Sequence, residues 1–165
     1  MKILLVGGGG REHAIADALT RENVAVDLLA TPGNPGIAQL ARVASVSATN
    51  IPGLVELAER EQAKLVIVGP EAPLEAGLVD ALQQRNIPVF GPTMAAAKVE
   101  TSKAETKSMM LNFGIPTAHA ETHRLASTAR EAVTSRFGAP VVIKASGLAA
   151  GKGVIVCHTI KEAFD

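Results

Sequence analysis

The chain has 165 residues, 16 basic and 16 acidic side chains, and a composition that is 47% hydrophobic but only 2% aromatic. The balanced charge and the shortage of aromatic rings argue against nucleic acid as a partner. The single cysteine, Cys157, excludes an internal disulfide, and no apolar run approaches the ~18 residues of a membrane span. The start MKILLVGGGG is too short an apolar stretch for a signal peptide, so we expect a soluble, cytoplasmic protein with no membrane partner.

Short apolar runs alternate with helix-like segments through the first hundred residues. The predicted strands are 2–6, 24–30, 41–46, 64–68 and 87–91, and the predicted helical segments are 11–22, 51–61 and 73–85. In the last segment Leu74, Leu78 and Leu82 fall four residues apart, as on one face of a helix. This alternation predicts right-handed crossovers and an α/β fold: an open parallel sheet flanked by helices.

The pattern changes after Thr93, and we place a domain boundary near residue 100, which gives domains 1–100 and 101–165. The second part predicts one or two helices over 94–114, a strand at 117–122, a helix at 127–138, strands at 139–144 and 154–157, and a helix from 159. Because no stop signal ends the last helix, we expect an incomplete domain whose apolar segments, such as VVIKA, need cover.

Four consecutive glycines, residues 7–10, follow the first predicted strand. The backbone amides of Gly8, Gly9 and Gly10 and the start of the next helix predict an anion site, to which Arg11 adds positive charge. A dinucleotide is not expected, because the third glycine of the G-x-G-x-x-G fingerprint is replaced by Glu12 and the second strand ends without a carboxylate.

Turn-rich loops also follow the other predicted strands, at 31–36, 69–73 and 91–93. Because the carboxyl ends of parallel strands meet at one edge of a sheet, these loops predict a ligand crevice there. Glu71 has two interpretations, which stay open at this point. It accepts hydrogen bonds from sugar hydroxyls, or it caps the helix that starts near Pro73.

The second glycine-rich loop, 145–153, is not a Walker loop, because Ser146 stands at its first glycine position and a strand follows it. A strand, a loop and a returning strand predict a hairpin that folds over a nucleotide, with its amides and Lys152 on the phosphates. Lys144 ends an apolar strand and there requires an anionic partner. The scattered histidines His119, His123 and His158 predict no metal site.

The motifs GGGGREHA, PGN, VGPEAPLEAGLVDAL, FGPT, TSKA and KASGLAAGKGVIV, in this order, resemble the phosphoribosylamine–glycine ligase family of ATP-grasp enzymes. The resemblance implies a Rossmann-like pre-ATP-grasp domain followed by the beginning of an ATP-grasp domain. It also implies a reaction in which ATP activates glycine as an acyl phosphate. The amine of 5-phosphoribosylamine then attacks the acyl phosphate to give glycinamide ribonucleotide, ADP and phosphate in purine biosynthesis.

The resemblance assigns binding residues but no catalytic one. Phosphoribosylamine would be held by Gly8, Gly9, Gly10, Arg11 and Glu71, and ATP by Lys103, Lys144, Gly147, Gly151, Lys152 and Gly153. Family members are more than twice as long, so the ligands of Mg2+ or Mn2+ are expected beyond residue 165. The missing C-terminal part is therefore an expected partner, and we expect this chain to be inactive alone.

Two local departures from the family accompany this resemblance. Ser146 stands where the family usually has an aspartate, and ETSKAET around Lys103 differs from the usual E-G-S-K-A-F. Two alternative functions remain open at this stage. One is a different ATP-grasp ligase, against which GGREHA and GPEAPL argue. The other is a non-catalytic phosphoribosyl-binding module or a partner subunit completed by a second chain.

Overall fold

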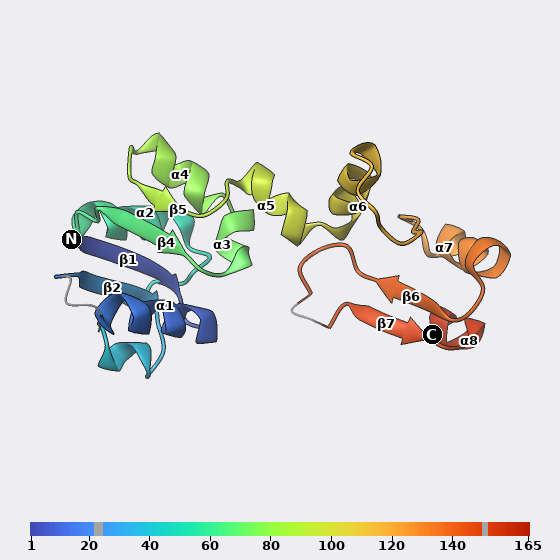
Figure 1. Cartoon of the computed structure of the whole chain (residues 1–165), viewed down its shortest axis with the longest axis horizontal. Coiled ribbons are helices and arrows are strands. Elements are labelled where there is room, and N and C mark those ends of the chain that lie inside the picture. Colours follow the sequence, from blue (N-terminus) through green and yellow to red (C-terminus); the bar gives the residue numbers. More distant parts are fainter. Residues whose placement is uncertain (22–24, 150–151) are drawn as a thin grey trace. The chain divides into compact units, whose positions relative to one another are not determined.

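The computed structural model describes residues 1–21, 25–149 and 152–165 of the chain. It divides into two compact units, Met1–Ala97 and Lys98–Asp165, which are described separately (Figure 1). Within the described residues, no helix has the length and apolar character that a membrane crossing requires.

The first unit is built around a five-stranded, fully parallel sheet with strand order β3-β2-β1-β4-β5. The strands are β1 (Lys2–Gly7), β2 (Asp27–Pro32), β3 (Arg42–Val43), β4 (Leu65–Val68) and β5 (Val89–Phe90). The helices are α1 (Gly10–Arg21), the 3-10 turn η1 (Ile37–Gln39), α2 (Ile51–Arg60), α3 (Glu71–Glu75), α4 (Leu78–Gln84) and the start of α5 (Met94–Thr101). The open parallel sheet predicted from the sequence is confirmed.

Two apolar clusters cover the two faces of this sheet. Leu4 and Val6 of β1 pack into a cluster with α2 and α4, whereas Ile3 and Leu5 pack with residues of α1 and η1 on the opposite face. Figure 1 shows α1 on one side of this sheet and α2 and α4 on the other. Successive side chains of a strand point to opposite faces, so a central strand with helices on both sides must be apolar throughout. This requirement explains the continuous apolar run ILLV, residues 3–6, that follows Lys2.

The predicted helical segment 73–85 is two helices rather than one. Gly77 adopts a left-handed backbone conformation (φ +82°) and separates α3 from α4. A glycine takes this conformation at little cost, and the chain uses it to change direction. Leu74, Leu78 and Leu82 are nevertheless all buried, because both helices turn their apolar sides to the same sheet face.

The second unit holds the rest of α5, four further helical or turn elements and a two-stranded antiparallel hairpin among its described residues. These are α6 (Lys103–Asn112), α7 (Ala126–Ala132), the π-helical turn η2 (Val133–Phe137), β6 (Val141–Lys144), β7 (Val154–Cys157) and α8 (Ile160–Phe164). The break between α5 and α6 falls at Ser102, and Gly114 (φ +64°) follows α6. Of the one or two helices predicted over 94–114, the structure therefore has two.

The strand predicted at 117–122 is wrong, because this segment is irregular. Side chains, rather than a neighbouring strand, form hydrogen bonds with this segment. Lys107 Nζ donates to Thr117 Oγ1 at 2.5 Å and to the Ala118 carbonyl at 2.8 Å, and Glu121 forms a two-point ion pair with Arg136. A strand requires a backbone partner, which this segment does not have among the described residues.

Both faces of the β6–β7 hairpin carry exposed apolar side chains. Val142, Ile143, Val154, Ile155 and Val156 are each between 36% and 60% exposed. Only Cys157, at the end of β7, is buried among the residues of the two strands. The expectation that the VVIKA segment needs cover agrees with this exposure.

A charge network lies at the amino-terminal ends of the strands of the first sheet, the end opposite to Gly8, Gly9 and Gly10, which follow β1. Arg42 Nη2 contacts both Asp27 and Glu61 at 3.2 Å, and Lys2 Nζ lies 3.6 Å from the Glu61 carboxylate. The hydrogen bond from Arg42 is the main cause that lowers the pKa of the Glu61 carboxyl.

Glu61→Gln is therefore expected to lower stability slightly at neutral pH, and the difference from the parent should shrink as the pH falls. The sign follows because a lowered folded-state pKa stabilises above the unfolded pKa and loses that effect below about pH 4. Urea unfolding at several pH values measures the difference, with exposed Glu56→Gln on α2 as the matched control. A difference independent of pH would contradict the assignment.

Candidate functional site

The turn after β1 is held tightly by the loop after β2. A Cβ atom on Gly8 would lie 2.3 Å from the carbonyl oxygen of Gly33, so only glycine fits there. Asn34 bridges the two loops: its Nδ2 donates to the Gly8 carbonyl at 2.9 Å, and its Oδ1 accepts the Ile37 amide at 2.8 Å. The structure thus brings the predicted GGGG and PGN motifs together.

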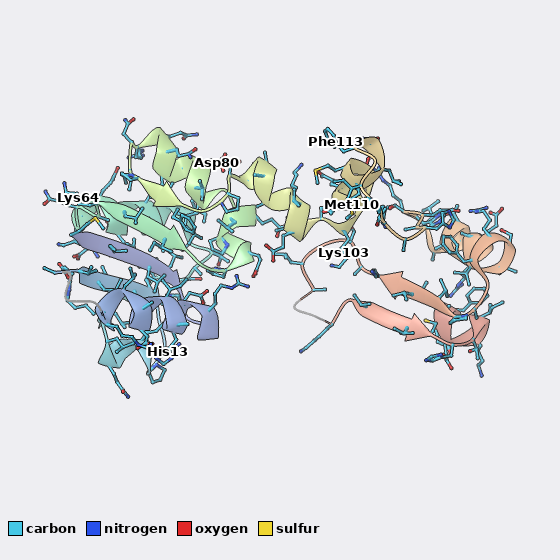
Figure 2. All side chains as sticks on the ribbon, in the orientation of Figure 1. His13, Lys64, Asp80, Lys103, Met110 and Phe113 are labelled. Atoms are coloured by element: carbon cyan, nitrogen blue, oxygen red, sulfur yellow. The ribbon has the colours of Figure 1, made fainter. Side chains whose placement is uncertain are left out.

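The start of α1 lies beside an open hollow of about 400 Å³. Gly10, His13, Ala14 and Asp17 line it. The ring of His13 also lies against the backbone of Gly36, where a Cβ atom would be 2.3 Å from it (Figure 2). His13 therefore has a packing role between α1 and the loop after β2, and it borders the space next to the glycine turn.

Arg11 joins the glycine turn to the loop after β4. Its Nη1 donates to the Gly69 carbonyl at 2.7 Å and to Glu71 Oε1 at 3.0 Å. The pKa of the Glu71 carboxyl is lowered, first by a hydrogen bond from its own backbone amide and then by Arg11. Since Glu71 is the first residue of α3, its carboxylate also satisfies an amide at a helix start. A contact with sugar hydroxyls stays a prediction.

Gly9 and Gly10 differ in what their amides do. The Gly9 amide donates to Glu12 Oε2 at 2.6 Å, so this hydrogen is already bound within the protein. Gly10 opens α1, and the first amides of a helix have no acceptor within that helix. The amides at the start of α1, with the side chain of Arg11 nearby, therefore form the stronger part of the predicted anion site.

In the second unit, the start of α6 is docked on the loop after β6. The Lys103 amide donates to the Ser146 carbonyl at 3.0 Å, and Lys103 Nζ donates to the Gly147 carbonyl at 3.1 Å. The Ala104 amide donates to Ser146 Oγ at 3.1 Å. The structure thus brings together Lys103 and the glycine-rich loop, which are more than 40 residues apart in the sequence.

The remaining predicted nucleotide ligands lie on the hairpin. Lys144 ends the apolar strand β6, as expected, but its side chain is exposed, as is that of Lys152, so the expected requirement for an anionic partner of Lys144 is corrected. Gly153 accepts the Ala145 amide at 2.7 Å, and a Cβ atom on it would meet Ala149 at 2.5 Å. Gly151 lies outside the described residues.

Ser146 supplies a second side-chain acceptor at the start of α6, beside the N-cap residue Ser102, which accepts the Glu105 amide. Ser146→Ala is expected to cost about 0.5–2 kcal/mol at the start of α6, because the Ala104 amide loses its acceptor. Ser146→Asp should instead stabilise it through the helix dipole. Hydrogen exchange at the Ala104 amide measures both effects, with Ser135→Ala as the control, since Ser135 Oγ donates to the Glu131 carbonyl. Equal exchange in Ser146→Ala and Ser135→Ala would contradict the capping role.

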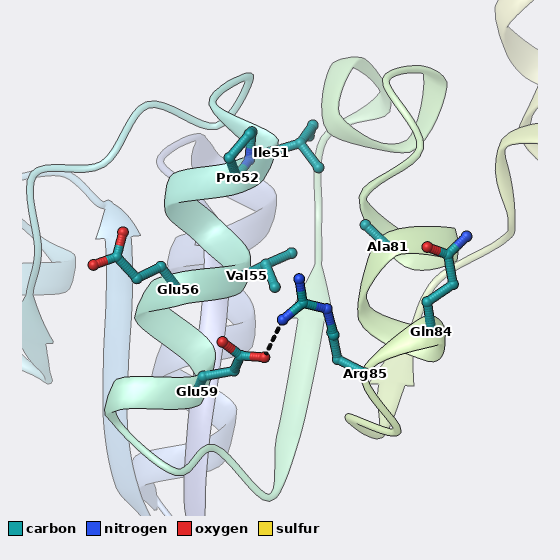
Figure 3. A pocket seen from close by; sticks show the side chains of 8 residues that line it. All are labelled: Ile51, Pro52, Val55, Glu56, Glu59, Ala81, Gln84 and Arg85. Atoms are coloured by element: carbon teal, nitrogen blue, oxygen red, sulfur yellow. Dashed lines mark hydrogen bonds and ion pairs between the residues drawn. The ribbon is translucent and has the colours of Figure 1, made fainter.

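A second hollow, of about 310 Å³, lies between α2 and α4 (Figure 3). An ion pair between Arg85 Nη1 and Glu59 Oε1, at 2.9 Å, crosses it. None of the predicted site residues lines this hollow. Across the described ranges, no group of three or more His, Cys, Asp and Glu side chains is arranged to hold a metal ion.

Sequence reasoning missed two residues that organise the first site. Asn34 was noted only as part of the PGN motif, and its hydrogen bond to the Gly8 carbonyl links loops 26 residues apart. Glu12 was noted only as a failure of the dinucleotide fingerprint, yet it is 3% exposed and accepts the Gly9 amide. A signal was available for Glu12, because an acidic residue three positions after a helix cap indicates a capping box.

Comparison with known proteins gives matches over the whole chain. Residues 1–100 match the family described as phosphoribosylglycinamide synthetase, N domain, and residues 101–165 match its ATP-grasp (A) domain. The chain is 48% identical over 163 residues to a phosphoribosylamine–glycine ligase of Phenylobacterium zucineum. That alignment covers 99% of this chain and 38% of the relative, so the chain spans well under half the length of such curated relatives.

Two solved structures show the same fold. A phosphoribosylamine–glycine ligase from Thermotoga maritima superposes with a TM-score of 0.78 at 28% identity, covering 99% of this chain and 38% of the other. A carboxyaminoimidazole ribonucleotide synthase from Aspergillus clavatus, solved with ATP, has a TM-score of 0.76 at 17% identity and covers 98% of this chain and 42% of the other. At that identity the second likeness shows the fold alone.

Proposed function

Since the chain belongs to the phosphoribosylglycinamide synthetase family, we propose that the whole protein joins glycine to 5-phosphoribosylamine in purine biosynthesis, in the cytoplasm, at the expense of ATP. The observation that carries this proposal is the 48% identity to a phosphoribosylamine–glycine ligase over nearly the whole chain. Because the chain spans 38% of that relative, we expect it to lack ligase activity when it is alone.

The proposed reaction has two steps. A carboxylate oxygen of glycine attacks the terminal phosphorus of ATP, the bond from that phosphorus to ADP breaks, and glycyl phosphate forms. The amine nitrogen of phosphoribosylamine then attacks the acyl carbon, the bond from that carbon to the phosphate oxygen breaks, and the nitrogen loses a proton. The products are glycinamide ribonucleotide, ADP and phosphate.

The first unit would hold the phosphate of phosphoribosylamine. The turn of Gly8, Gly9 and Gly10 leads into the first amides of α1, and a dianion is favoured at the amino end of a helix. Arg11 supplies a guanidinium that forms two-point contacts with phosphate oxygens. Glu71, which pairs with Arg11 at 3.0 Å, would lie where the ribose hydroxyls can donate to its carboxylate.

The second unit would hold part of the ATP phosphates. Lys103, Lys144 and Lys152 supply positive charge, and Gly147, Gly151 and Gly153 allow the backbone to approach the nucleotide. Charge on the phosphates increases during phosphoryl transfer, and fixed cations and amides stabilise it. Mg2+ or Mn2+ would bridge the phosphates in such a reaction, and we assign no residue of this chain to the metal.

A calorimetric titration tests the first part of the proposal. We expect glycinamide ribonucleotide, the stable product, to bind the chain and NAD not to bind, with magnesium-ATP as a third titrant for the second unit. Binding of NAD would overturn the phosphoribosyl assignment of the glycine turn. No measurable binding of glycinamide ribonucleotide would show that this chain does not form the phosphoribosyl site.

A further inference from the structure

Glu12 is a buried charged residue for which the proposed reaction has no use. It is the third residue of α1 and is only 3% exposed. Burial of a carboxylate is costly unless hydrogen bonds or positive charge compensate it. Its position in the first turn of a helix supplies part of that compensation, and its neighbours show what it does there.

One carboxylate oxygen fixes the glycine turn. Glu12 Oε2 accepts the Gly9 amide at 2.6 Å, a short distance that fits a hydrogen bond to a charged acceptor. Gly9 directly precedes the first residue of α1, so this bond ties the turn to the helix that follows it. It determines where the amides at the helix start point.

The rest of the Glu12 side chain fills the space between the ends of β1 and β4. A Cβ atom on Gly7 would lie 2.5 Å from Glu12 Cγ, and a Cβ atom on Gly69 would lie 2.1 Å from Glu12 Oε1. The Gly69 carbonyl accepts Arg11 Nη1 at 2.7 Å. Two adjacent residues of α1 thus meet the Gly69 turn, one by packing and one by a hydrogen bond.

We propose that Glu12 is a positioning residue for the phosphoribosyl substrate, which acts through the Gly9 amide and through the Gly69 turn, whose carbonyl accepts Arg11. Without the buried carboxylate, the glycine turn and the Gly69 turn lose their fixed spacing, and the helix amides and the guanidinium no longer converge on one phosphate. This inference rests on the proposed function of the first unit.

The test compares the affinity of the parent and its variants for glycinamide ribonucleotide by calorimetry. Glu12→Gln keeps the shape of the side chain and removes its charge, and we expect about tenfold weaker binding with a nearly unchanged melting temperature. Glu12→Ala removes the acceptor as well, and we expect about a 100-fold loss. Gly69→Ala, which displaces the intact carboxylate, should also weaken binding and covers the case in which a Glu12 variant fails to fold.

Leu57→Ala separates positioning from general instability. Leu57 of α2 is 1% exposed in the apolar cluster on the sheet face opposite α1, so this variant should lose stability and keep its affinity. The inference is overturned if Glu12→Gln binds within twofold of the parent, or if Leu57→Ala loses as much affinity as Glu12→Gln. A parent chain that does not bind glycinamide ribonucleotide would show that this chain does not form the phosphoribosyl site, and would overturn this inference without deciding the activity of the whole protein.

Discussion

Replacing Gly8 with alanine is expected to destabilise the first unit by about 1–3 kcal/mol, the usual cost of forcing an extra methyl group into a packed site. The added Cβ atom would lie 2.3 Å from the Gly33 carbonyl oxygen. The backbone fixes the position of the Cβ atom and of the carbonyl oxygen, so no side-chain rotation can relieve this contact. The loops after β1 and β2 would have to separate, and the Asn34 bond to the Gly8 carbonyl would lengthen or break.

Gly10→Ala is the matched control for this prediction. A Cβ atom on Gly10 would meet no atom within 4 Å, and alanine is the better helix former, so stability should stay equal or rise by up to about 1 kcal/mol. Urea unfolding of both variants measures the difference. Equal stability of Gly8→Ala and the parent would show that the two loops are not packed as the structure has them.

The architecture of the first unit could be predicted because its signals are local. Central parallel strands are covered on both faces, so runs such as ILLV must be apolar throughout, and they alternate with helix periods. The segment 73–85 was misassigned because leucines at 74, 78 and 82 keep helical spacing across Gly77, whose left-handed conformation breaks the helix. The spacing of the leucines reflects their burial on one face of the sheet, and it gives no information about the backbone conformation of Gly77.

The second unit was less predictable because its contacts are long-range. The segment 117–122 has strand-like residues, but the side chains of Lys107 and Arg136 bind it in the structure. Ser146 looked like the loss of a carboxylate, whereas its hydroxyl accepts the Ala104 amide, 42 residues away. No local pattern in the sequence reports a pairing over that separation.

The site was predictable at the level of motifs and not at the level of contacts. The glycines after β1 indicate an anion site, and the spacing of Gly9 and Glu12 carries the local signal of a capping box. No local pattern indicates that Arg11 donates to the Gly69 carbonyl, 58 residues later. That contact depends on the strand order, which places β4 directly beside β1.

Arg11→Met is expected to weaken binding of glycinamide ribonucleotide about 10- to 100-fold, which is the range for losing hydrogen bonds to a charged group. The fold should tolerate the change, because the Arg11 side chain is 61% exposed and exposed ion pairs contribute less than about 1 kcal/mol. Arg21→Met removes the same charge from the last turn of α1 and is the control. If both variants weaken binding equally, the effect comes from net charge and Arg11 has no special role.

Glu71→Gln distinguishes two roles of Glu71, accepting ribose hydroxyls and holding Arg11. We expect this variant to bind glycinamide ribonucleotide several-fold more weakly and to keep its affinity for inorganic phosphate. That result would follow if the carboxylate accepts ribose hydroxyls, which inorganic phosphate lacks. A parallel loss of affinity for both ligands would mean that Glu71 acts only by holding Arg11, to which it is hydrogen-bonded at 3.0 Å.

The pH dependence of binding gives a second test at this residue. The backbone amide of Glu71 and the Arg11 side chain lower the pKa of the Glu71 carboxyl, so Glu71 stays ionised throughout mildly acidic conditions. A change in affinity between about pH 7 and 5 therefore reports the second ionisation of the bound phosphate, whose pKa is about 6, and should be the same in Glu71→Gln.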